Sequence, residues 1–223
     1  MQGLIDRFPE SKESTKTCKF CRGEIGGPGD FCGETHQKFY ARKSAPKKYL
    51  KSCGVPERYV DASFDDYKGP AENIAKLQSA AGSCIYIHGG TGTGKTYLAA
   101  SYIRYMATVD KLKGRFVTAT GLFIALRQSI NAGDEFAVLN DYTSRNLLVI
   151  DDIGTEKLSD YTLQSWYYII NERYNARLPT VLTSNLSLQR IAEDYGAVGD
   201  RIASRIASGR SVIKLVDKDY RLK

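Results

Sequence analysis

Short apolar runs and longer amphipathic segments alternate along the chain after about residue 60. Five of the apolar runs have the length of buried strands, and they cover residues 84–88, 115–119, 147–151, 180–184 and 211–216. Between them, apolar side chains recur at helical spacing after Lys95 and again after Asp160. Strands that alternate with helices predict an α/β fold with a five-stranded parallel sheet, covered by helices on both faces.

Length and composition limit the class of protein. The chain has 223 residues, of which 42% are hydrophobic and 26% charged, and this fits one globular domain with a small appendage. No apolar run approaches the roughly 20 residues of a transmembrane helix, and the first ten residues lack the apolar core of a secretory signal. We therefore expect a cytoplasmic protein that does not associate with a membrane.

The first 60 residues differ in composition from the rest of the chain. They contain four of the five cysteines and carry 12 basic against 7 acidic residues, whereas the remaining residues carry 20 against 18. A local basic excess is compatible with a polyanionic partner. The chain thus divides near residue 60 into a polar N-terminal region and an α/β domain.

A phosphate-binding loop lies between the first expected strand and the first expected helix. Residues 89–96 match the pattern G-x-x-x-x-G-K-[ST] at every fixed position, and they read Gly89, Gly90, Thr91, Gly92, Thr93, Gly94, Lys95, Thr96. Glycines allow successive N–H groups to converge on phosphates, and the following helix adds its positive end. Lys95 is expected to contact the β- and γ-phosphates of ATP, and the Thr96 hydroxyl to bind Mg²⁺.

Polar side chains follow two of the later apolar runs. Asp151 and Asp152 come after the apolar residues 147–150, about 55 residues beyond the phosphate loop. Asp151 is the candidate to hold Mg²⁺, and Asp152 is the candidate to orient or deprotonate the attacking water. Asn185 follows the next run, where its amide could hold a water near the γ-phosphate or cap a helix.

Six further motifs accompany the phosphate loop in a fixed order. They are PERY, SFDDY, LLVIDDIG, IINERY, LTSNL and DRIASRI, at residues 56–59, 63–67, 147–154, 169–174, 182–186 and 200–206. In this combination the chain resembles the AAA+ ATPases of the DnaC/DnaI helicase-loader group, which also includes the IstB-type transposition ATPases. The resemblance covers residues 56–223 and implies an AAA+ ATPase domain there, with a separate N-terminal module over residues 1–55.

The resemblance also implies roles for single residues. Asn185 would be the sensor residue of the fourth strand, Arg205 the arginine finger that reaches the ATP of a neighbouring subunit, and Arg221 the second sensor arginine. Arg201 lies one helical turn before Arg205 and could exchange roles with it. Most AAA+ proteins have glutamate where this chain has Asp152. The shorter side chain predicts slow hydrolysis, or the use of ATP mainly as an assembly signal.

The cysteine cluster has the spacing of a zinc site. Cys18 and Cys21 form a C-x-x-C pair, Cys32 follows after ten residues, and His36 after three more. These four ligands could close a tetrahedral structural Zn²⁺ site, whose binding energy would fold a region too small for a core. Cys53 is an alternative fourth ligand, and reduced cysteines in a flexible arm are the alternative to any zinc site. DnaI-type loaders resemble this layout, with an N-terminal zinc module that contacts the helicase.

Two other segments could contact nucleic acid. Residues 38–51 contain six basic residues and no acidic ones, with Phe39, Tyr40 and Tyr49 interleaved. This composition suits single-stranded DNA, an acidic helicase surface or a soluble linker equally. Related ATPases place single-stranded DNA contacts near residues 121–142, where Phe136 is a candidate contact and Phe123 is expected in the helix core.

The sequence as a whole predicts an ATPase that loads a ring-shaped, hexameric replicative helicase onto single-stranded DNA. The ATPase domains would self-associate through nucleotide-bridged subunit interfaces. One alternative is an IstB-like helper ATPase for a transposase, against which the cysteine cluster argues. Another is an adaptor that binds ATP, DNA and a partner without hydrolysing the nucleotide.

Overall fold

The computed structural model describes residues 46–80, 83–109, 114–209, 211–216 and 219–220. Cys18, Cys21, Cys32 and His36 lie outside these ranges, as does Arg221. In chain order the elements are α2 (Pro46–Ser52), η1 (Glu57–Tyr59), α3 (Ala71–Ser79), β1 (Cys84–Gly89), α4 (Lys95–Val109), β2 (Gly114–Thr118), α5 (Ala119–Ala132), α6 (Glu135–Ser144), β3 (Leu147–Ile153), α7 (Asp160–Asn175), β4 (Thr180–Ser184), α8 (Leu188–Ser208) and β5 (Ser211–Leu215).

The five strands form one parallel sheet in the order β2-β3-β4-β1-β5. This confirms the expected α/β fold, and the observed strands differ from the predicted ones by at most two residues at an end. Since β4 lies between β1 and β3, the carboxyl ends of these three strands lie side by side at one edge. In open parallel sheets, ligands bind outside this edge, where the strand order reverses.

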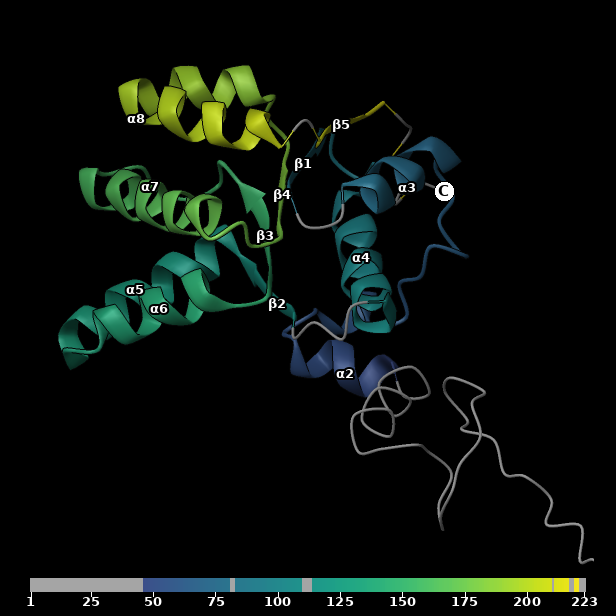
Figure 1. The fold of residues 1–223 in the computed structure, drawn as a ribbon, viewed down its shortest axis with the longest axis horizontal. Coiled ribbons are helices and arrows are strands. Elements are labelled where there is room, and N and C mark those ends of the chain that lie inside the picture. The colour runs from purple at the N-terminus through teal and green to yellow at the C-terminus, as the bar shows by residue number, and fades with distance from the viewer. Residues whose placement is uncertain (1–45, 81–82, 110–113, 210, 217–218, 221–223) are drawn as a thin grey trace, which may run out of the picture. The chain divides into compact units, whose positions relative to one another are not determined.

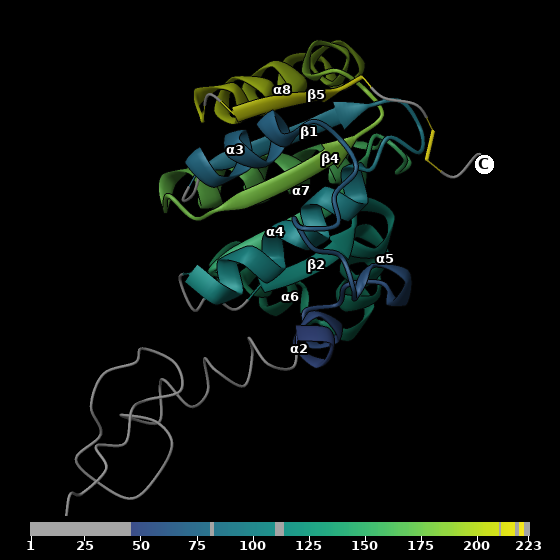
Figure 2. The ribbon, with the colours of Figure 1, turned by 90° about the vertical axis from the view of Figure 1, so that its right-hand side faces the viewer.

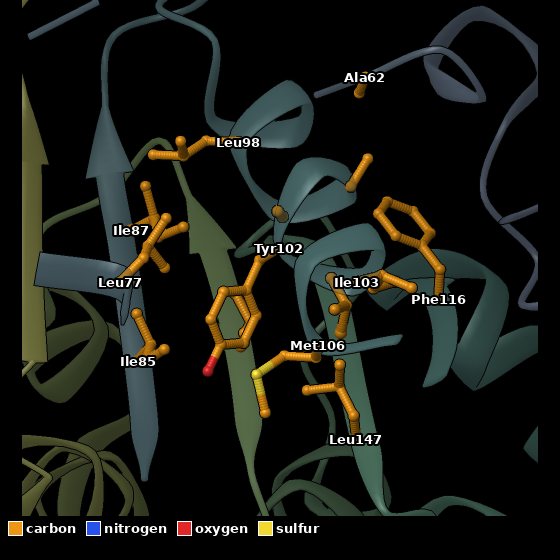
Figure 3. Close-up of a cluster of buried hydrophobic side chains, with 14 of the residues drawn as sticks. Ala62, Leu77, Ile85, Ile87, Leu98, Tyr102, Ile103, Met106, Phe116 and Leu147 are labelled. Atoms are coloured by element: carbon orange, nitrogen blue, oxygen red, sulfur yellow. The ribbon is translucent and has the colours of Figure 1, made fainter. Parts of the chain in front are cut away.

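Helices cover both faces of the sheet. In Figure 1, α3 and α4 lie on one side of the strands and α5 to α8 on the other, and Figure 2 shows α3 and α4 in front of the sheet. Each face has its own hydrophobic cluster. Figure 3 shows the first, in which Leu98, Tyr102 and Met106 of α4 face the β1 side chains Ile85 and Ile87. Fully burying one such aliphatic side chain stabilises the fold by about 1.5–3 kcal/mol.

The segment that precedes the first strand packs against the same face as α4. Leu50, Cys53 and Val55 are buried in the first cluster, and the Cys53 carbonyl accepts a hydrogen bond of 2.7 Å from the Phe116 amide. Within the described residues, the first hydrophobic cluster therefore already includes α2 and the residues that follow it, which precede residue 56. Tyr49 packs against this cluster too.

Two lysines of the basic segment 38–51 pair with acidic residues of the same fold. Lys47 lies 2.8 Å from Asp61, and Lys51 lies 2.8 Å from Glu57. Exposed ion pairs of this kind contribute little to stability. They do, however, reduce the positive charge that this part of the segment can offer to a partner.

Local sequence signals explain where several helices begin and bend. The side chains of Thr118, Ser159 and Ser187 cap α5, α7 and α8 by accepting backbone N–H hydrogen bonds. Helix α8 is kinked at Gly196, which has φ 60° and ψ −145°, a conformation open essentially to glycine alone. Over the described ranges, no helix is both long and apolar enough to cross a membrane.

Candidate nucleotide-binding site

The phosphate loop connects the end of β1 with the start of α4. Gly92 and Gly94 adopt φ values of 76° and 91°, a conformation that residues with a Cβ atom seldom adopt. Lys95 is only 5% exposed, and its Nζ donates to the carbonyls of Gly89 (3.0 Å) and Gly90 (2.8 Å) and to Asn185 Oδ1 (2.7 Å). The structure thus brings Lys95 and Asn185 together and directs the ammonium group into the loop.

Thr96 and Asp151 meet beside the loop. Thr96 Oγ1 donates a 3.1 Å hydrogen bond to Asp151 Oδ2, and Asp151 is 5% exposed. Burial raises the pKa of the Asp151 carboxyl, and a hydrogen bond from Thr183 partly counters this effect. A hydroxyl and a carboxylate are the hard oxygen ligands that Mg²⁺ prefers, so the residues fit a magnesium site next to bound phosphates.

Asp152 has an unusual backbone conformation. Its φ is 61°, in the left-handed region that non-glycine residues seldom occupy, and its peptide N–H donates to Thr183 Oγ1 at 3.0 Å. The Asp152 carbonyl accepts a 2.8 Å hydrogen bond from the Thr155 hydroxyl. Strained residues of this kind cluster at functional sites, where the surrounding structure holds them.

A cleft of about 250 Å³ opens next to the loop. The residues that line it come from the phosphate loop, from α4, from the segment before β1 and from the chain after β5. They are Arg58, Tyr59, Asp66, Tyr67, Lys68, Gly92, Gly94, Lys95, Thr96, Tyr97 and Tyr220. The rings of Tyr67 and Tyr97 stack with their centroids 6.4 Å apart. Aromatic faces beside a phosphate loop suit a nucleoside base. The motifs at 56–59 and 63–67, which have no role on sequence grounds alone, therefore contribute one wall of this cleft.

The C-terminal segment closes part of the same cleft. The Tyr220 amide donates to the Gly92 carbonyl at 3.1 Å, and its hydroxyl donates to the Lys68 carbonyl at 3.3 Å. A side chain at position 92 would collide with the Asp219 carboxylate. Arg221 itself lies outside the described residues, so only its neighbour Tyr220 is observed at the cleft.

A buried carboxylate stabilises the loop that follows the acidic pair. Glu156 is 8% exposed, and its oxygens accept from the Gly154 amide (2.9 Å), from Trp166 Nε1 (2.8 Å) and from the Tyr195 hydroxyl. Burial, together with Glu156, raises the pKa of Tyr195. Glu156 therefore links the loop after Asp152 to both α7 and α8.

Comparison with known proteins identifies the group to which this architecture belongs. Residues 70–223 match the family described as IstB-like ATP binding protein. The chain belongs to this ATP-binding family. It is 25% identical over 181 residues to the replicative helicase loader DnaC of Escherichia coli (strain K12), which covers 74% of this chain and 71% of that protein. It is also 28% identical over 141 residues to the putative ATP-binding protein of insertion sequence IS232 from Bacillus thuringiensis, covering 62% of this chain and 56% of that relative.

Two solved structures share the fold of this chain. A crystal structure of the DnaC helicase loader superposes with a TM-score of 0.62 at 26% identity, over 72% of this chain and 99% of that one. A crystal structure of DnaI gives a TM-score of 0.63 at 26% identity, over 72% and 94% of the two chains. The sheet and phosphate loop of this IstB-like chain thus match the AAA+ P-loop domain of these proteins.

Arg205 lies at the other end of the sheet from the phosphate loop. Its guanidinium donates to Asn171 Oδ1 at 2.9 Å and to the Tyr167 hydroxyl at 3.0 Å, and it lies 4.8 Å from the Tyr167 ring centroid. It lines a cavity of about 280 Å³ together with Cys84 and Gly209, at the amino end of β1. Arg201 lies 6.0 Å from the centroid of the same ring and is exposed.

The other sequence-based candidates have mixed outcomes. Phe123 is 2% exposed, as expected of a core residue, whereas Phe136 is 74% exposed on α6 and stays a candidate contact. Within the ranges the structure describes, no cluster of three or more His, Cys, Asp and Glu side chains could hold a metal ion. The predicted zinc ligands are not among those residues, and Cys53, the alternative ligand, is 2% exposed within the first hydrophobic cluster.

Proposed function

We propose that this protein is an ATP-dependent loader of a ring-shaped replicative DNA helicase. The observation that carries the proposal is the correspondence with the DnaC helicase loader, which extends over 99% of that solved chain. The proposal agrees with a phosphate loop, an acidic pair and an Asn185 amide gathered at one edge of the sheet.

ATP would bind with its phosphates on residues 89–96 and its base in the tyrosine-lined cleft. Lys95 would exchange its bonds to loop carbonyls for bonds to the phosphates, while Thr96 and Asp151 would hold Mg²⁺, which neutralises phosphate charge. Asp152 and Asn185 would position the attacking water. Because Asp152 is short and its backbone is strained, we expect slow turnover, in which ATP binding rather than rapid hydrolysis drives assembly.

Arg205 would complete the site of a neighbouring copy. Strand β1 separates the Arg205 cavity from the phosphate loop by roughly 16 Å, at about 3.3 Å per residue, so this guanidinium is remote from its own phosphate loop. Its bonds to Asn171 and Tyr167 hold it in place on the surface of α7 and α8. A guanidinium presented in this way can stabilise charge on a γ-phosphoryl group that an adjacent subunit binds.

Two features outside the nucleotide site belong to the same proposal. The N-terminal module, with Cys18, Cys21, Cys32 and His36 around Zn²⁺, would dock on the helicase. Single-stranded DNA would contact the exposed side of α5 and α6, where Ile124, Ile130 and Phe136 are solvent-exposed. Exposed apolar and aromatic side chains offer stacking surfaces for unpaired bases.

Co-purification with candidate replicative helicases, with and without ATP, tests the loader proposal. We expect ATP to promote the complex, and Lys95→Ala to remove this ATP dependence.

The shared site has its own test, in which inactive Lys95→Ala and Arg205→Ala chains are mixed. Partial recovery of phosphate release is expected, because an intact loop of one chain can meet an intact Arg205 of the other. No recovery at any ratio would argue against a shared site.

A helper role for a transposase is the second candidate, and the similarity to the IS232 ATP-binding protein favours it. The same pull-down with a transposase in place of the helicase separates the two functions. Binding to the transposase alone would replace the loader proposal with this one.

A further inference from the structure

The pairing between β3 and β4 breaks at the acidic pair. The register runs regularly from Leu148–Thr180 to Ile150–Leu182 and resumes only at Ile153–Ser184. Two residues of β3, Asp151 and Asp152, therefore lie opposite a single residue of β4, which is Thr183. A bulge of this kind redirects side chains and leaves a peptide group without its usual partner in the ladder.

The Thr183 hydroxyl takes the place of the missing ladder bond. It accepts the 3.0 Å hydrogen bond from the Asp152 amide and donates a 2.6 Å hydrogen bond to Asp151 Oδ1. The hydroxyl proton thus binds Asp151, and a lone pair of the same oxygen binds Asp152. Thr183 is completely buried. On its other edge, β4 pairs regularly with β1, where Thr183 lies opposite Ile87.

We propose that Thr183 is a positioning residue that sets both acids of the nucleotide site through this single hydroxyl. The inference rests on the proposed role of Asp151 in holding Mg²⁺. With Oδ1 bound to Thr183, the other oxygen, Oδ2, faces Thr96, so the carboxylate is oriented before any metal binds. The bond to the Asp152 amide holds that residue at its positive φ of 61°.

The effect of losing this hydroxyl follows from its place behind the metal ligand. Groups that orient a metal ligand typically change metal affinity by 10- to 100-fold when they are removed. Thr183→Val keeps the shape of the side chain and removes only the hydroxyl. We therefore expect the Mg²⁺ concentration for half-maximal ATP binding to rise by about 10-fold or more, with ATP binding in EDTA unchanged.

The experiment measures binding of a fluorescent ATP analogue to the full chain during Mg²⁺ titration, so it does not depend on helicase loading or on turnover. Thr183→Ser retains the hydroxyl and should remain within about threefold of the wild type, well below the loss expected from removing an orienting group. Thr162→Val makes the same change at another buried threonine, which contacts neither acid, and should leave the Mg²⁺ dependence unaltered.

A metal-free measurement supplies a second criterion. In the absence of nucleotide and Mg²⁺, the Asp152 amide should exchange with solvent at least about tenfold faster in Thr183→Val than in the wild type, because its hydrogen bond is lost. The proposal is overturned if Thr183→Val folds and shows neither change. It is also overturned if Thr183→Ser shows the same rise in Mg²⁺ requirement as Thr183→Val, since the methyl group would then be responsible.

Discussion

Replacing Glu156 tests how firmly the loop after the acidic pair is held. Glu156→Gln retains the volume of the side chain, but it removes the charge and directs an amide donor toward groups that are donors themselves. Three donors converge on this carboxylate, from Gly154, Trp166 and Tyr195. Hydrogen bonds to a charged group contribute about 1.5–3 kcal/mol, against about 0.5–1.5 kcal/mol for neutral pairs. A loss of about 3 kcal/mol is therefore expected.

Urea denaturation followed by tryptophan fluorescence measures this loss, since Trp166 is itself a donor to Glu156. In a thermal melt, the Tm of Glu156→Gln should lie roughly 6–12 °C below that of the wild type, because 1 kcal/mol corresponds to about 2–4 °C in a domain of this size. Tyr195→Phe, which removes one donor to the carboxylate, should cost about 1.5–3 kcal/mol. Glu193→Gln makes the same change at an exposed position on α8 and should cost less than about 0.5 kcal/mol. A Glu156→Gln protein within experimental error of the Glu193→Gln control would refute the reasoning.

Three further predictions concern the proposed arginine finger, the partly buried thiol of Cys84 and the zinc site. Arg205→Ala should abolish ATP turnover and leave ATP binding by the isolated subunit unchanged, as phosphate release and nucleotide titration would measure; normal turnover would reject the finger assignment. Burial raises the pKa of the Cys84 thiol to about 12 from 9.0, so alkylation at pH 8, followed by mass spectrometry, should be about 1000-fold slower than for an exposed thiol and should accelerate tenfold per pH unit. Metal analysis of the purified protein should find about one Zn²⁺ per chain if Cys18, Cys21, Cys32 and His36 form the predicted site.

The parts of the fold that depend on local pattern are predictable from the sequence. The five strands and the helices after Lys95 and Asp160 follow from short apolar runs and helical spacing, because burial on a sheet or a helix face selects residues at that period. The phosphate loop follows in the same way, since its chemistry requires glycines and a lysine at fixed neighbouring positions. Such signals lie within a few residues of each other along the chain.

Thr183 and Glu156 could not be found in this way. Thr183 depends on a register break between two strands, which is a property of two segments about 30 residues apart and leaves no local pattern. In the sequence, Glu156 has no feature that distinguishes it from other acidic residues in loops. Its hydrogen bonds with Trp166 and Tyr195 are evident only from the structure. Tyr220 is similar, because its contact with Gly92 joins residues that are far apart in sequence.

The direction of the strands gives a physical reason for the proposal that two copies share one nucleotide site. All five strands are parallel, so every group at their carboxyl ends, including Lys95, Asp151 and Asn185, gathers at one edge. Helix α8 then runs back across the sheet to begin β5, and this return carries Arg205 to the amino end of β1. The connection that completes the sheet thus separates the guanidinium from the phosphates. In the proposed arrangement, a second copy with its phosphate-loop edge against α7 and α8 of this one would bring the two groups together.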